Sequence, residues 1–140
     1  MYNKKNLIQA INKAAKSLVN IFPYFIGIVL LMSIINVSVP RSFYSHIFTK
    51  NPILDPLIGA AIGSISAGNP IISYIISGEL LHQGVSLTAV TAFVLSWVSV
   101  GVIQMPAECA ILGKKFAIYR NILSFIFAII IAVIIGAILG

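Results

Sequence analysis

A short polar segment, Ser66-Ala67-Gly68-Asn69-Pro70, interrupts a long apolar run in this sequence. The run extends from Ile53 to Leu81, and its 29 residues would measure roughly 43 Å as one straight helix, against a bilayer core of roughly 30 Å. The interruption leaves pieces of 11 and 12 residues, each able to reach about halfway across as a helix. Backbone broken at that depth is tolerated only inside protein or beside a polar cavity. In transporters, such breaks are a favoured place for the substrate.

The composition is typical of an integral membrane protein. Hydrophobic residues make up 59% of the 140 and charged residues only 9%, against about 25% charged in soluble domains. The nine Lys and Arg residues border the apolar segments, so the net charge of +6 indicates membrane topology and anionic lipid rather than nucleic acid. A single cysteine excludes an intrachain disulfide, and the common nucleotide and metal motifs are absent. We therefore expect no cofactor, no metal and no enzyme activity.

The residue periodicity predicts an all-α membrane protein with a single domain over residues 1–140. Pro23 is expected to bend the chain, and residues 40–51 and 107–119 are expected to form loops. Asp55, Asn69 and Ser86 are predicted helix caps, the first two followed by proline at the first helical position. The predicted elements are an amphipathic interfacial helix at 4–22, a transmembrane helix at 24–39, the broken segment at 53–81, and transmembrane helices at 87–105 and 120–139.

Two topologies are open for the broken segment. If it spans the membrane, the Lys and Arg residues split as four against five across the bilayer. If it enters and leaves on one side as a re-entrant hairpin, the split becomes seven against two, with the larger group on the N-terminal side. The positive-inside rule favours the hairpin and a cytoplasmic N-terminus.

Polar, glycine and proline residues recur in a fixed order through the second half of the chain. They are Gly63-Ser64, Ser66-Ala67-Gly68-Asn69-Pro70, Gly78-Glu79-Leu80-Leu81, Gly84-Val85-Ser86, Ala89-Val90-Thr91-Ala92-Phe93, Trp97-Val98, Gln104, Pro106-Ala107-Glu108, Leu112-Gly113 and Arg120-Asn121. In these motifs the chain resembles the ArsP-like predicted permease family. The resemblance implies a multi-spanning membrane protein, and some family members export arsenicals. Members typically have two related halves, so the resemblance implies a half-length chain that works as a dimer.

The break itself is the candidate substrate site. A helix that starts near the middle of the membrane presents free N–H groups and a partial positive charge, which favour an anion or an electronegative atom. The alternative is that the hydroxyl groups only satisfy broken backbone. The predicted binding residues are Ser64, Ser66, Gly68, Asn69, Pro70, Ser73 and Gln104.

Glu108 is the candidate for proton coupling, because ionisable groups beside membrane pathways often carry protons. The alternative is a surface carboxylate paired with Lys114 or Lys115.

Two helix faces carry small residues at every fourth position. Gly59 and Gly63 form one, and the other, in the last helix, consists of Ser124, Ala128, Ala132 and Gly136. Small residues let helices approach closely, so we expect the second face to pack on another helix in a homodimer or larger homo-oligomer. These features predict a multi-pass permease subunit of the cell membrane for a small polar or anionic solute. The alternative is a non-transporting scaffold or assembly subunit.

Overall fold

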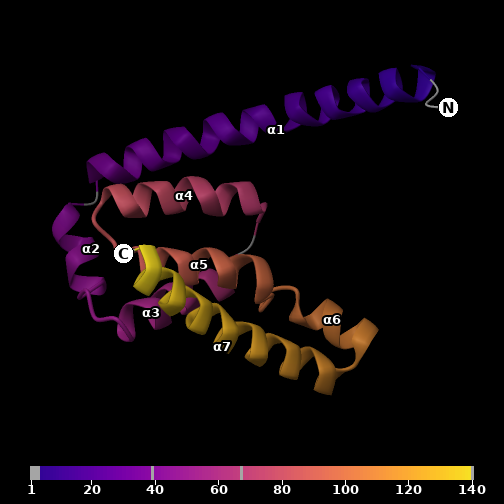
Figure 1. Cartoon of the computed structure of the whole chain (residues 1–140). Helices are drawn as coiled ribbons and strands as arrows, with labels where there is room; N and C mark the ends of the chain where they lie inside the picture. The colour runs from indigo at the N-terminus through magenta and orange to yellow at the C-terminus, as the bar shows by residue number, and fades with distance from the viewer. Residues whose placement is uncertain (1–3, 39, 67, 140) are drawn as a thin grey trace. The chain divides into compact units, whose positions relative to one another are not determined.

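The computed structural model describes residues 4–38, 40–66 and 68–139, and every regular element in these ranges is an α-helix (Figure 1). The chain separates into two compact units, one made of α1 and the other of α2 to α7. The helices are α1 (Lys4–Ser38), α2 (Arg41–Ile47), α3 (Leu54–Ile65), α4 (Pro70–His82), α5 (Leu87–Ser99), α6 (Met105–Leu112) and α7 (Lys114–Leu139). The all-α fold class is confirmed.

The first unit differs from the sequence prediction at Pro23. Two helices, at 4–22 and 24–39, were expected with a bend between them, but α1 is one helix of 35 residues with Pro23 inside it. A proline removes a single backbone hydrogen bond, and long helical flanks on both sides can continue through that loss.

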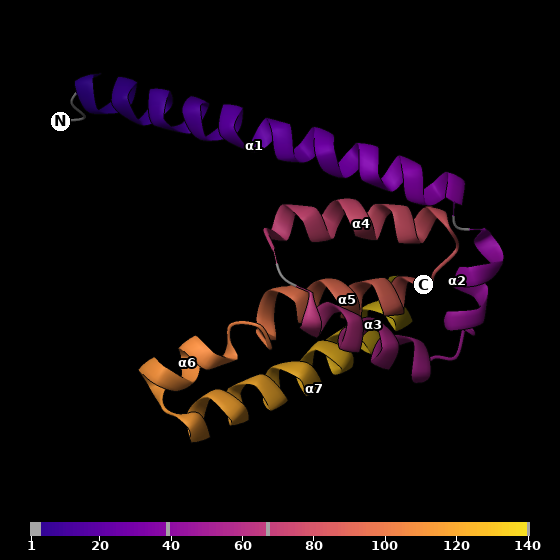
Figure 2. The same ribbon diagram turned by 180° about the vertical axis from the view of Figure 1, so that it is seen from behind.

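In the larger unit the chain reverses direction at the polar break. The starts of α3 and α5 lie together, because Ser86 Oγ is 3.5 Å from Asp55 Oδ2. The far end of α4 packs there too, with Leu80 against the buried cluster of Phe48, Val85, Ala89 and Val90. The helices α3 and α4 are therefore antiparallel, and α3 and α5 are parallel, as Figures 1 and 2 both show. This reversal has the form of the predicted hairpin, although its two arms pack on α5 rather than on each other.

Small residues make the contacts between the packed helices. A Cβ atom added at Gly59 or Gly63 would overlap with the backbone carbonyl of Ala89 or Phe93, so α3 lies directly against the backbone of α5. At the centre, three alanines from α3, α5 and α7 are each 0% exposed: Ala60, Ala92 and Ala132. The glycine and alanine spacing in the sequence thus sets how closely these helices approach.

The last helix, α7, buries its small residues and exposes its large ones. Its buried residues are Ala117, Asn121, Ala128 and Ala132. The exposed residues include Ile122, Ile126, Ile130 and Ile134. In the part of the chain that the structure describes, α7 is the one helix long and apolar enough to cross a membrane. The predicted small-residue face is indeed packed against another helix, but that helix is α5 of the same chain.

Local boundaries differ from the prediction in three places. The helix expected at 87–105 ends at Ser99, and Pro106 lies in the first turn of a new helix instead of ending one. The expected loops at 40–51 and 107–119 contain α2, most of α6 and the start of α7. Asp55 is a buried acceptor for the Thr49 and Lys50 amides, both at 3.0 Å, and not a helix cap.

Candidate binding cavity between two helix breaks

The predicted break at residues 66–69 is held by local hydrogen bonds. Ser66 ends α3, with its hydroxyl donating to the carbonyl of Ile62 at 2.7 Å. Asn69 caps α4, and its Oδ1 accepts from the amide of Ile71 at 3.0 Å, as the sequence predicted. The second predicted cap, Ser86, likewise accepts from Ala89 at the start of α5. Gly68 has a φ angle of +149°, a conformation that side-chain-bearing residues rarely adopt.

A second break, which the sequence did not predict, lies between α5 and α6. The amide of Gly101 leaves the helical pattern and donates to Asn121 Oδ1 at 2.8 Å. Asn121 is 4% exposed, and its Nδ2 donates to the Ala117 carbonyl and to Glu108 Oε2, both at 2.9 Å. A residue of α7 thus ends α5 early and positions a carboxylate of α6.

The two breaks line one cavity with a volume of about 150 Å³. The first break contributes Ser66, Gly68 and Pro70, and Arg120 approaches from α7. The end of α5 and the second break contribute Trp97, Val98, Ser99, Val100, Gly101, Ile103 and Gln104. Segments that are distant in the chain therefore share one small, partly polar space.

Four of the predicted binding residues lie in this cavity: Ser66, Gly68, Pro70 and Gln104. Asn69 sits between two of them as the helix cap. Ser64 and Ser73 are not among the lining residues. Both are buried, and their hydroxyls donate to the carbonyls of Ala61 and Pro70 within their own helices.

Arg120 is the cation of the cavity, and it forms an ion pair with Glu108. The sequence analysis offered Lys114 or Lys115 as the structural partner of Glu108, whereas the structure pairs it with Arg120. The Arg120 side chain is 40% exposed and that of Glu108 is 16% exposed. From the sequence, Arg120 was expected to be a topology charge and part of the Arg120-Asn121 motif, and not a site residue. Its neighbour Asn121, a polar residue in an apolar helix, was the available signal that this turn of α7 faces protein.

Trp97 contributes an aromatic side chain to the cavity wall. Its Nε1 atom is buried and has no hydrogen-bond acceptor among the described residues. A Cβ atom at Gly68 would lie 3.5 Å from Trp97 Cζ2, which is on the indole edge that carries Nε1. The ring also makes an edge-to-face contact with Phe93, at 5.3 Å between centroids.

The charges beside the cavity come from helix ends and from the Arg120–Glu108 ion pair. Helices α4 and α6 begin at the cavity, which places two partial positive charges there, while α3 and α5 end at it and offset them. Among the described residues, Arg120 and Gln104 bring N–H groups to the cavity and no carboxylate lines it, while Glu108 pairs with Arg120 from outside.

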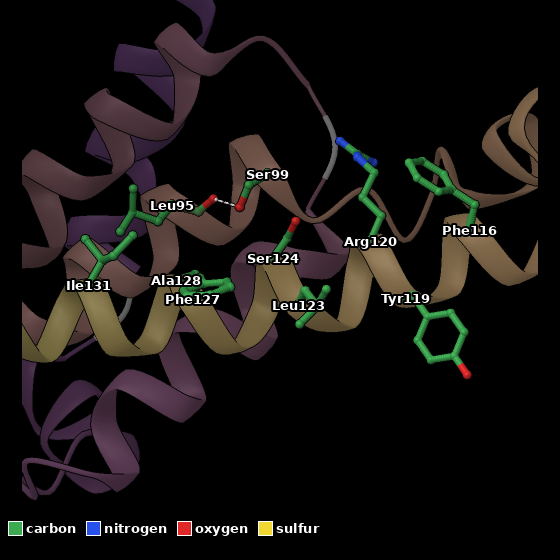
Figure 3. Close-up of a pocket in the computed structure, with 10 residues that line it drawn as sticks. All are labelled: Leu95, Ser99, Phe116, Tyr119, Arg120, Leu123, Ser124, Phe127, Ala128 and Ile131. Atoms are coloured by element: carbon green, nitrogen blue, oxygen red, sulfur yellow. Dashed lines mark hydrogen bonds between the residues drawn. The ribbon is translucent and has the colours of Figure 1, made fainter.

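A larger, mostly apolar groove of about 510 Å³ runs between α5 and α7 (Figure 3). Ser99 and Arg120 line both this groove and the cavity. The Ser99 hydroxyl donates to the Leu95 carbonyl at 2.5 Å and is thus committed to its own helix.

Comparison of the chain with protein-family models, with curated proteins and with solved structures gave no match. The resemblance to the ArsP-like predicted permease family therefore stays a prediction that rests on the motifs alone.

Proposed function

We propose that this protein is a permease subunit that moves a small polar or anionic solute across the cell membrane. The observation that carries the proposal is the meeting of two helix breaks at one cavity with an arginine. One break is the turn between the antiparallel helices α3 and α4, and the other separates α5 from α6, so each leaves backbone groups without helical partners beside the cavity. Broken helices that meet are a common way to build a solute site in transporters.

The helix lengths support a multi-pass arrangement. Helix α7 has 26 residues, or about 39 Å, and exceeds the bilayer core of roughly 30 Å. Helices α5 and α6 have 13 and 8 residues, about 20 Å and about 12 Å, so they would cross together as one broken span. We propose that residues 24–39 form the third crossing, that α3 and α4 re-enter from the outer side, and that the N-terminus is cytoplasmic.

The exposed apolar surface of α7 also supports a membrane setting. Soluble monomers rarely expose contiguous apolar patches larger than a few hundred Å². Because Ala128 and Ala132 already pack inside the chain, we propose that a homo-oligomer forms through the large apolar residues of α7. Glu108, beside the cavity, is the proposed carrier of a coupled proton.

Flux into vesicles tests the function. The purified chain would be placed in liposomes, and uptake of sulfate, phosphate and arsenate would be measured for the wild type, Gly68→Leu and Gly78→Leu. The side chain at position 68 would point at Trp97, whereas a Cβ at Gly78 meets no atom within 4 Å. We expect Gly68→Leu to abolish uptake and Gly78→Leu to retain it.

Asn69→Ala provides a graded variant for the same assay. Loss of a helix cap costs about 1 kcal/mol, which the rest of the fold should tolerate, so uptake should fall more than thermal stability does. If the wild type transports none of these anions, or if both leucine variants transport equally well, the permease proposal is wrong. The non-transporting scaffold would then be the better account, with the apolar groove between α5 and α7 as its docking surface.

A further inference from the structure

Arg120 stands between two places that could hold a negative charge. One is the Glu108 carboxylate, with which it is paired, and the other is the cavity, whose wall it forms. Glu108 itself does not line the cavity. We infer that Arg120 is exchanged between Glu108 and a bound oxyanion, so that binding of the anion and protonation of Glu108 are linked. This inference deepens the proposed function, because it names the substrate class and the coupling step of the same site.

The geometry makes Arg120 the mobile partner and Glu108 the anchored one. Asn121 Nδ2 donates to Glu108 Oε2 at 2.9 Å, and Asn121 is held in turn by Ala117 and Gly101. The Arg120 side chain is 40% exposed, and a guanidinium group on a long stem can turn to a new acceptor while its backbone stays in place. Anion binding would therefore need a side-chain movement and no movement of a helix.

The charges around the pair are few. Helix α5 and the second break, residues 87–104, contain no titratable group, and the near end of α4 contributes only Pro70. The remaining titratable residues of α6 and the start of α7 are Cys109, Lys114, Lys115 and Tyr119. The two lysines and Tyr119 are exposed to solvent, and none of these four has an ion pair with Glu108. Glu108 is therefore the one carboxylate that competes for Arg120 among the described residues.

The sign of the linkage follows from this competition. An ionised Glu108 occupies Arg120, and the cavity then lacks a free cation. A protonated Glu108 keeps its hydrogen bond with Asn121 but attracts Arg120 much less, and the guanidinium becomes available to an oxyanion. Arg120 suits this role because its planar N–H groups can bind two oxygens at once. Gln104 adds a donor for the remaining oxygens.

The single tryptophan of the chain makes the inference measurable. Trp97 lies in the cavity wall, so its fluorescence reports on that site with no other tryptophan contributing. The full chain in lipid nanodiscs would be titrated with sodium sulfate at constant ionic strength, between about pH 5 and about pH 8. Sulfate keeps its charge over this range, so a change in its affinity reports on the protein.

We expect the affinity of the wild type for sulfate to rise as the pH falls, by up to about tenfold per pH unit for one linked proton. Glu108→Gln should bind sulfate at all pH values as tightly as the acidic wild type. Arg120→Gln should bind weakly at all pH values. Glu79→Gln is the matched control and should behave as the wild type, because Glu79 bonds to Gln83 at the far end of α4.

Two results would overturn the inference. One is a wild-type protein whose affinity for sulfate is the same at every pH, or that binds no sulfate at any pH. This measurement uses only the wild type and does not depend on the folding of a variant. The other is a Glu108→Gln protein, folded by its thermal transition, that binds sulfate no more tightly than the wild type does at neutral pH. Anion uptake by vesicles together with pH-independent binding would leave the permease proposal standing and remove only the linkage. Sulfate binding that depends on pH, without any uptake of anions by vesicles, would rule out the permease proposal and leave the anion site standing.

Discussion

Substituting Gly63 by alanine tests the packing that places the two breaks side by side. The added Cβ would overlap with the Phe93 carbonyl oxygen and lie 3.0 Å from the carbonyl carbon. These are backbone atoms of a helix, so no side-chain rotation can relieve the contact, and α3 must move away from α5. Overpacking of this kind costs about 1–3 kcal/mol, whereas replacing a helical glycine by alanine returns about 0.5–1 kcal/mol. Because the clash is with backbone, it should outweigh this gain, leaving Gly63→Ala less stable by up to about 2.5 kcal/mol.

Gly78→Ala is the matched control, since it makes the same chemical change in a helix where nothing lies within 4 Å. It should raise the free energy of unfolding by about 0.5–1 kcal/mol. Thermal unfolding of both proteins in detergent micelles would therefore shift the midpoint in opposite directions from the wild type. Equal stability of the two variants would mean that α3 and α5 do not approach as closely as the glycines indicate.

The other two predictions concern the second break and the topology. Asn121→Ala should destabilise the protein by about 1–3 kcal/mol, because it leaves the Gly101 amide without its acceptor. Thermal unfolding would measure this loss, and an unchanged midpoint would mean that the second break does not depend on Asn121. In a background without the native cysteine, Lys50→Cys and Gln83→Cys should both be labelled by an impermeant thiol reagent from the outer side of oriented vesicles, because the antiparallel α3 and α4 bring both positions to one end. Labelling from opposite sides would exclude the re-entrant hairpin.

Local patterns in the sequence predicted the first break but not the second. Asn69 and Ser86 bond to amides two and three residues away, and such short-range contacts can be inferred from sequence spacing. The end of α5 at Ser99 depends on Asn121, twenty residues beyond Gly101, and a contact at that sequence separation cannot be inferred from residues 98–103. Pro106 is compatible with the end of one helix or the first turn of the next, and only the fold decides between them.

The candidate site was predictable to the same extent. The break residues that line the cavity follow from the polar interruption and the glycine. The places of Arg120 and Trp97 in the cavity wall could not be predicted from the sequence. An arginine at the start of a long apolar helix is equally typical of a membrane border, and a tryptophan in an apolar helix is equally typical of a core. Their place beside the break depends on how α5 and α7 pack, through alanines such as Ala92 and Ala132.

Protection of a cysteine in the cavity between the two breaks would show whether that cavity holds a small anion. Gln104→Cys would be placed in the cavity and Ile111→Cys on the exposed side of α6, both in a background without the native cysteine. The rate of modification by a water-soluble methanethiosulfonate would be measured with and without sulfate. We predict that sulfate slows modification at position 104 and leaves position 111 unaffected. Equal rates at position 104 with and without sulfate, over the same acidic and neutral pH values, would contradict the account.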